Sequence, residues 1–121
     1  MILADTSIWI DHLSGNDPIM ARLLEDRRVT VHPFVIGELA LGYLEPRNFL
    51  LEVLHNLHAA EVATNDEVLA FIENNNLYGS GIGYIDAHLL VSARLTPDTA
   101  LWTRDGDLAA VAAKTGVALA R

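Results

Sequence analysis

Short apolar segments alternate with longer segments of helical periodicity along the whole chain of 121 residues. The short segments are too brief for ordinary helices and are typical of buried strands; they span residues 2–4, 29–31, 59–63, 100–103 and 117–119. Strands that are separated by helices pair in parallel through crossovers, which cover both faces of the sheet. The alternation therefore predicts one three-layer α/β/α domain over residues 1–121, with a central parallel sheet of about five strands.

Local signals mark where the helices between these strands begin. Asp17-Pro18 is typical of a helix start, with the acid as cap and the proline in the first turn. Thr64-Asn65-Asp66-Glu67 matches a capping box and predicts a helix that ends near 74. Further helices are expected after Asp5 and over about 33–41, 46–57, 83–96 and 108–114.

Composition excludes several classes of protein. Hydrophobic residues make up 51% of the chain, too many for a disordered protein. No apolar run approaches the roughly 20 residues that span a bilayer, so a cytoplasmic protein without membrane contact is expected. Cysteine is absent, which excludes disulfides and thiolate metal sites. The net charge of −8 argues against a broad basic surface for nonspecific nucleic-acid binding.

Acidic residues follow two of the expected strands. Asp5 comes directly after the first strand, and Asp105 comes two residues after Thr103, with Asp107 close behind. Ligands of open α/β sheets bind beyond the carboxyl ends of the strands, so these carboxylates are candidate functional groups. The alternative for Asp5 is a helix cap, because Asp5, Thr6 and Ser7 precede a helical segment.

Two further acids lie among apolar neighbours in the first turns of expected helices, Glu38 after Pro33 and Asp86 after Gly83. Each alone is explained by a favourable interaction with the helix dipole. Three or four carboxylates in one crevice would, however, repel one another. A divalent cation makes such a cluster tolerable, and oxygen ligands without thiolates favour Mg²⁺, with Mn²⁺ as a substitute.

Four stretches that carry these acids resemble PIN-domain ribonucleases, in particular the VapC toxins of bacterial toxin–antitoxin pairs. They are Ala4-Asp5-Thr6-Ser7, Gly37-Glu38-Leu39, residues 83–89 (GYIDAHL) and residues 102–108 (WTRDGDL). The resemblance covers essentially the whole chain, in order. It implies a parallel sheet with the acids gathered at its carboxyl edge.

The resemblance also implies roles for individual residues. The catalytic and metal-binding acids would be Asp5, Glu38, Asp86 and Asp105, with Asp107 as an auxiliary metal ligand and with Ser7 and Thr103 as auxiliary hydroxyl groups. Asp5 is expected to be the central ligand, since a strand end is a rigid mount. Cleavage by a metal-activated water would leave 5′-phosphate and 3′-hydroxyl ends on RNA.

Partners follow from the same resemblance. A groove between hydrophobic helical segments joined at 42–46 would hold an amphipathic helix of a cognate VapB-like antitoxin, whose basic tail would reach the acids. A homodimer is expected, which would gather Arg47, Arg94 and Arg104 into a cationic channel for RNA.

Other functions of α/β proteins with a strand-end acid agree less well with these residues. A haloacid-dehalogenase-like phosphatase needs a second aspartate where this chain has Ser7, and the acid and lysine set of a receiver domain is absent. A non-catalytic PIN-fold module that acts by partner capture is the remaining alternative.

Other motifs in the chain have simpler explanations than a ligand site. The glycine loop 79–83 follows no strand and is therefore no dinucleotide site. Glu52, His55 and His58 are expected at the surface, and His88 is not expected to act as a ligand.

Overall fold

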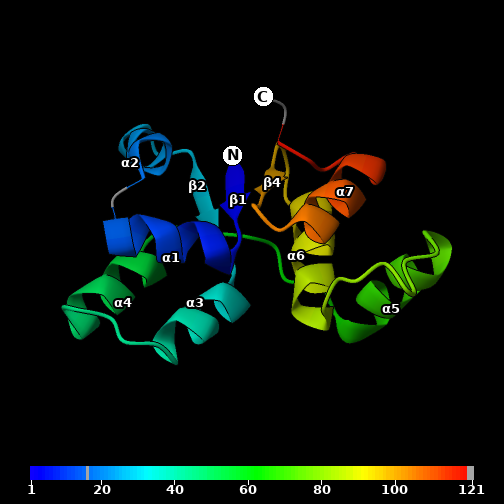
Figure 1. The fold of residues 1–121 in the computed structure, drawn as a ribbon, viewed down its shortest axis with the longest axis horizontal. Helices are drawn as coiled ribbons and strands as arrows, with labels where there is room; N and C mark the ends of the chain where they lie inside the picture. The colour runs from blue at the N-terminus through cyan, green and yellow to red at the C-terminus, as the bar shows by residue number, and fades with distance from the viewer. Residues whose placement is uncertain (16, 120–121) are drawn as a thin grey trace.

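The computed structural model describes residues 1–15 and 17–119 (Figure 1). In chain order the described elements are β1 (Ile2–Ala4), α1 (Thr6–Gly15), α2 (Pro18–Glu25), β2 (Val29–Val31), α3 (Pro33–Ala40), α4 (Arg47–His55), β3 (His58–Ala59), α5 (Asn65–Asn74), α6 (Tyr84–Leu95), β4 (Ala100–Trp102) and α7 (Gly106–Lys114).

The strands form one parallel sheet in the order β3-β2-β1-β4. In register, Leu3 lies opposite Thr30 on one side and Leu101 on the other. Figure 1 shows α1, α2, α3 and α4 on one side of the sheet and α5, α6 and α7 on the other. The predicted three-layer architecture with a parallel sheet is confirmed. Because all strands are parallel, their carboxyl ends lie at one edge of the sheet.

Two of the five expected strands differ from the prediction by more than one residue. The third strand, expected at 59–63, is the two-residue β3, since β2 ends at Val31 and offers no partner after the Ala60 backbone N–H donates to the Val31 carbonyl at 2.9 Å. The last, expected at 117–119, makes a single parallel bridge between Ala118 and Leu101. The described sheet therefore has four strands and one bridged segment beside β4.

The helix starts follow the local signals in the sequence. Asp17 caps α2 by accepting hydrogen bonds from the backbone N–H groups of Ile19 and Met20, and Pro18 occupies the first turn. Thr64 and Glu67 form the expected capping box of α5. The capping hydrogen bonds at both starts are therefore local, because the side chain satisfies amides that the helix leaves unpaired.

The core lies between the sheet and the two helical layers. Its fully buried side chains include Leu3, Ile8, Met20, Leu90, Leu101 and Leu108. Helix α6 is buried at every position from 87 to 93, so it is the central helix of its layer. No described helix has both the length and the apolar character needed to cross a membrane.

Candidate active site

Asp5 leaves the carboxyl end of β1 and is only 5% exposed. Its Oδ1 accepts hydrogen bonds from the Ser7 hydroxyl at 2.5 Å and from the Ile8 backbone N–H at 3.2 Å. Its Oδ2 accepts a hydrogen bond from the Thr103 hydroxyl. Asp5 is thus a helix cap for α1, and it accepts more hydrogen bonds than Glu38, Asp86 or Asp105.

Thr103 and Asp105 belong to the short connection between β4 and α7. While donating to Asp5, the Thr103 hydroxyl oxygen accepts the backbone N–H of Asp105 at 3.0 Å. Asp105 in turn caps α7, because its Oδ1 accepts the N–H groups of Asp107 and Leu108 at 3.0 and 3.1 Å. Strand β4 ends at Trp102 rather than Thr103, so Asp105 follows the strand by three residues.

Glu38 and Asp86 face the same edge from helices on opposite sides of the sheet. Glu38, on α3, is exposed, and its Oε1 accepts the Thr6 hydroxyl at 2.8 Å. Asp86, in the first turn of α6, accepts the Gly83 N–H at 3.2 Å. Partial burial raises the pKa of Asp86, and the negative charges of Asp105, Asp5 and Glu38 raise it further. The four predicted acids therefore lie within electrostatic reach of one another.

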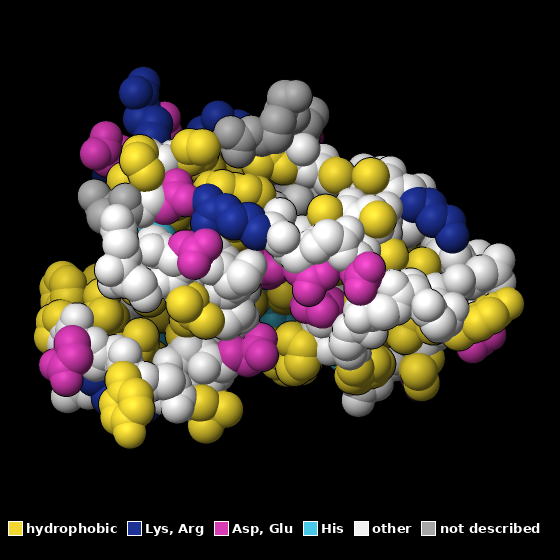
Figure 2. All heavy atoms as spheres, viewed as in Figure 1, with side chains coloured by type: hydrophobic (Ala, Val, Ile, Leu, Met, Phe, Trp, Pro, Cys, Tyr) yellow, Lys and Arg dark blue, Asp and Glu magenta, His cyan; other side chains and the backbone are white. Residues whose placement is uncertain are grey.

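No cation neutralises these acids within the described parts of the chain. The ion pairs formed there join Arg22 to Asp26 and Arg104 to Asp11 and Asp17, and include none of the four acids. Figure 2 shows acidic side chains around a hollow where α1, α3, α6 and α7 meet. The charge that gathers there is uncompensated.

The donor chemistry of the hollow fits a hard divalent ion, since it consists of carboxylate oxygens without thiolates. One oxygen of each of Glu38, Asp86 and Asp105 accepts no hydrogen bond from a described residue. In their present orientations, however, no three acidic or histidine side chains among residues 1–15 and 17–119 form a group that could hold a metal ion. The acids share an edge without forming a closed coordination shell.

Asp107, the predicted auxiliary acid, is exposed and lies against the glycine loop 79–83. A Cβ atom on Gly81 would come within 2.5 Å of the Asp107 carboxylate, and Gly81 has φ +90°. The positive φ favours glycine, whereas the exposed Asp107 side chain could turn aside from a Cβ atom. The loop that leads into α6 thus passes directly beside the acidic hollow.

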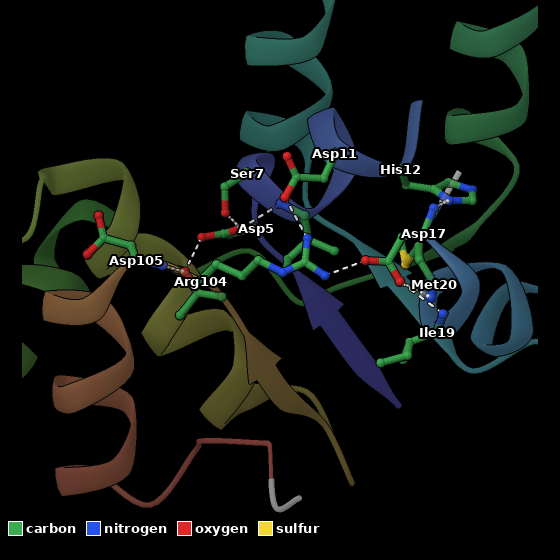
Figure 3. A network of polar contacts seen from close by, with 11 residues as sticks. Asp5, Ser7, Asp11, His12, Asp17, Ile19, Met20, Arg104 and Asp105 are labelled. Carbon is green, nitrogen blue, oxygen red and sulfur yellow. Dashed lines mark hydrogen bonds and ion pairs between the residues drawn. The ribbon is translucent and has the colours of Figure 1, made fainter. Parts of the chain in front are cut away.

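The structure adds a polar network that the sequence did not predict (Figure 3). Arg104, between Thr103 and Asp105, binds the carboxylates of Asp11 on α1 and Asp17 at the start of α2. The cap role of Asp17 was visible in the local sequence. Its pairing with an arginine 87 residues away was not, because no local pattern encodes that distance.

The three arginines expected in a cationic channel each have other partners. Arg47 donates to the carbonyls of Ala40 and Gly42, and Arg94 donates to the carbonyl of Thr115. Arg104 is engaged by two acids. Within one protomer these three arginines thus bind three separate sets of residues.

A buried histidine pair, His32 and His88, lies at the same edge of the sheet and was also missed as a pair. His32 follows β2, and its Nδ1 accepts the Phe34 N–H at 2.9 Å to cap α3. His88 Nε2 pairs with the Asn65 side-chain oxygen at 3.1 Å. Burial, with the charge of His88, lowers the pKa of His32 to about 4, and burial lowers the pKa of His88 as well.

The remaining histidine motif behaves as expected for a surface. Glu52, His55 and His58 are exposed. The His58 ring pairs with the Thr30 hydroxyl at 2.8 Å.

A groove of about 340 Å³ opens between α1, α3 and the segment that leads to α4. Its lining includes Ile10, Leu13, Tyr43 and Leu50, with Glu38 at one side. It includes residues 42–45 of the connection beside which a groove was expected, but α1 forms one of its walls, and α4 contributes Leu50. An acid of the hollow therefore also borders an apolar groove.

Comparison with known proteins gives two findings. The family model described as PIN domain matches residues 2–114. The chain is 48% identical over 120 residues to "Ribonuclease VapC32" of Mycobacterium tuberculosis strain CDC 1551 / Oshkosh, and equally to that of strain ATCC 25618 / H37Rv. Each alignment covers 99% of this chain and 97% of the relative.

Proposed function

The chain belongs to the PIN-domain family of VapC-like ribonucleases, and on that premise we propose that it is a Mg²⁺-dependent endoribonuclease, the toxin of a toxin–antitoxin pair. It would hydrolyse phosphodiester bonds of RNA and leave 5′-phosphate and 3′-hydroxyl ends. Mn²⁺ would substitute for Mg²⁺, because both accept several carboxylate oxygens.

One observation carries this proposal. Asp5, Glu38, Asp86 and Asp105 come from four separate parts of the chain to one edge of the sheet, where the pKa of Asp86 is raised in part by the other three. Such repulsion costs stability unless a cation relieves it. Family membership and this uncompensated charge together support a metal-dependent nuclease.

Asp5 is suited to the central role because its carboxylate is fixed. Its Oδ1 accepts two hydrogen bonds, from Ser7 and Ile8, whereas its Oδ2 accepts one, from Thr103. A carboxylate oxygen has two acceptor sites, so Oδ2 keeps one for a metal ion. Ser7 and Thr103 would therefore orient Asp5 rather than act on RNA themselves.

The other acids would complete the site with their uncommitted oxygens. Glu38, Asp86 and Asp105 would bind the ion, with Asp107 beside them as an auxiliary acid. A bound Mg²⁺ would supply Lewis acidity, which lowers the pKa of a water and offsets negative charge on the scissile phosphate. Thr103 would keep Asp5 and Asp105 in register, because its hydroxyl contacts both residues.

The groove supports a cognate VapB-like antitoxin as protein partner. Its apolar lining suits an amphipathic helix, and Glu38 at its side suits a basic residue that follows that helix. Nearby, Leu41 and Tyr43 are almost wholly exposed. Removal of basic residues from the antitoxin tail would be expected to weaken inhibition, and unchanged inhibition would contradict this arrangement.

We further propose a cytoplasmic homodimer as the working unit.

The proposal is tested by cleavage of cellular RNA with purified protein. Wild-type protein is expected to cut in Mg²⁺ or Mn²⁺ and to stop cutting in EDTA, with 5′-phosphate ends identified by direct ligation of the products. Asp5→Asn is expected to lower cleavage about 100- to 1000-fold, whereas Asp66→Asn, which removes an exposed acid on α5, should cut normally. Cleavage that persists in EDTA, or products with 5′-hydroxyl ends, would contradict the proposal. Growth arrest that survives Asp5→Asn would favour the non-catalytic binding module.

A further inference from the structure

We propose that Arg104 is a positioning residue that braces the connection 103–105 against α1 and α2 and thereby holds Thr103 and Asp105 in register with Asp5. This inference rests on the proposed nuclease function and adds a residue to its site. Arg104 would act through its neighbours, without contact with RNA.

Arg104 spans two helices with one guanidinium group. Its Nη1 donates to Asp11 Oδ2 at 2.5 Å, and its Nη2 donates to Asp17 Oδ2 (Figure 3). The group also lies over the ring of Trp102, 5.4 Å from the ring centre. A planar guanidinium can hold two carboxylates in fixed directions, which the single ammonium group of lysine cannot do as well.

The anchor at Asp17 is itself rigid. Asp17 is 11% exposed at its side chain, its Oδ1 caps α2 through Ile19 and Met20, and its backbone N–H donates to His12 Nδ1 at 3.1 Å. The hydrogen bond from Arg104 lowers the pKa of Asp17, so this partner stays ionised. Asp11 is the looser contact, since its side chain is 54% exposed.

Three consecutive residues are thus bonded to residues of four different elements. Thr103 is bonded to Asp5 at the end of β1, Arg104 to α1 and α2, and Asp105 to the first turn of α7. The contacts of Arg104 limit rotation of the backbone between Thr103 and Asp105. Small displacements of reacting groups cost large factors in rate, so a loose connection would slow the chemical step.

The alternative role for Arg104 is direct binding of an RNA phosphate. Two of the five N–H donors of the guanidinium already bind carboxylates, whose negative charge offsets the attraction of Arg104 for a phosphate. The two roles differ in what happens when the carboxylates are removed. If Arg104 holds the connection in place, removal of the carboxylates should slow cleavage. If Arg104 binds a phosphate, their removal should leave the guanidinium free to bind RNA.

The experiment compares Arg104→Gln, Arg104→Lys and the double variant D11N/D17N with wild type in RNA cleavage. Asparagine at 17 keeps an oxygen for capping α2, so the double variant removes the ionic contacts and spares the helix. Arg22→Gln is the matched control, because Arg22 forms an exposed ion pair with Asp26 at the end of α2. Thermal unfolding is measured for each protein, and the salt dependence of RNA binding is measured in the Asp5→Asn background.

We expect Arg104→Gln and D11N/D17N to lower kcat by about 10- to 100-fold with KM changed less than about twofold. Their combination should be no worse than either, because all remove one shared contact network. Arg104→Lys should fall between wild type and Arg104→Gln, and Arg22→Gln should match wild type. The slope of binding against salt should not change, since no phosphate contact is lost.

A wild-type kcat in Arg104→Gln would overturn the brace. So would a raised KM with a salt slope reduced by about 0.7, the change expected for one lost phosphate contact on a single strand. Normal kcat in D11N/D17N would overturn it as well, and this variant decides between the two roles if Arg104→Gln unfolds. Failure of the wild type to cleave any RNA would instead count against the proposed function, so the two failures are distinct.

Discussion

Asp5 and His32 occupy equivalent places in the fold and do different work. They follow the adjacent parallel strands β1 and β2, both are buried, and each caps the helix that comes next. Asp5 receives two further hydrogen bonds, from Ser7 and Thr103. His32 is fully buried and packs its ring 4.8 Å from that of Phe34 and 6.5 Å from that of His88.

The difference shows that a strand end provides a place for a functional group but not its chemistry. Hydroxyl and amide donors around Asp5 suit an anion, and neighbouring acids would supply further oxygen ligands to the proposed ion. Aromatic rings around His32 suit a neutral imidazole, and they lower its pKa to about 4 through burial. The first position suits catalysis, and the second suits packing.

Exchange of each residue for asparagine tests this division most strongly. Asp5→Asn is expected to lower kcat/KM about 100- to 1000-fold, since the proposed ion would lose a carboxylate ligand while the oxygen that caps α1 remains. His32→Asn should keep kcat within a few-fold of wild type but lower the free energy of unfolding by about 1–3 kcal/mol. RNA cleavage and chemical denaturation measure the two effects. Loss of cleavage in a stable His32→Asn protein would break the comparison.

The second prediction concerns stability against pH. The pKa of His32 is about 4 in the folded protein and 6.5 when unperturbed, so between these values the unfolded chain binds more protons. Stability should therefore fall as the pH drops from 6.5 to 4, by about 3 kcal/mol from this residue. His88, whose pKa is also lowered, changes stability in the same direction.

Denaturation curves of wild type and His32→Asn across this range isolate the contribution of His32. The loss should shrink in His32→Asn and remain in His55→Asn, because His55 is exposed. Equal acid sensitivity of all three proteins would show that His32 is not held neutral by burial.

The third prediction concerns the hydroxyl groups that distinguish Asp5 from His32. Thr103→Val keeps the shape of the side chain and removes its donor to Asp5 and its acceptor for Asp105. A loss of about 10- to 100-fold in activity is expected, as for other groups that orient a metal ligand. Thr103→Ser should restore most of it. Cleavage rates at saturating Mg²⁺ measure the effect, and a fully active Thr103→Val would remove Thr103 from the site.

The smallest effect is expected at Asp86. Its raised pKa means that the folded protein holds this proton more tightly than the unfolded chain, so the residue destabilises the fold as the pH rises above 3.8. Asp86→Asn should therefore raise the free energy of unfolding at pH 7 by roughly 1 kcal/mol. The gain should vanish near pH 3.

With Mn²⁺ added, the wild type is expected to become the more stable of the two proteins, because only the wild type keeps the full set of acids for the ion. Melting temperatures of both proteins with and without Mn²⁺ measure the gain from the substitution and the shift caused by the ion. A Mn²⁺ shift that is equal in wild type and Asp86→Asn would exclude Asp86 as a ligand.

Much of this architecture is predictable because local signals encode it. The apolar segments locate the strands near 2–4, 29–31 and 100–102, and the caps at Asp17 and Thr64 locate two helix starts. The rule that ligands bind beyond parallel strands selects Asp5 and Asp105. The predicted extent of the third strand is wrong because its neighbour β2 ends at Val31, where the chain turns into α3, so residues after Ala60 have no partner in the sheet.

The contacts around the site are less predictable, since they join residues far apart in the chain. Three such contacts depend on how helices pack rather than on local spacing. They join Thr6 to Glu38, Arg104 to Asp11 and Asp17, and His32 to His88. Local patterns also present the cap and the site residue as alternatives for Asp5, whereas in the fold one carboxylate has the position for both.

Asp5, Asp86 and Asp105 each bind a backbone amide at the start of a helix, whereas Glu38 binds only a side-chain hydroxyl. The effect of each acid on stability has an evolutionary consequence. A descendant that no longer degraded RNA would still be selected to keep Asp5 and Asp105, because each caps a helix. Positions 38 and 86, where loss of the charge costs no stability, would drift first, so among homologous sequences these two acids report on retained activity better than Asp5 and Asp105 do.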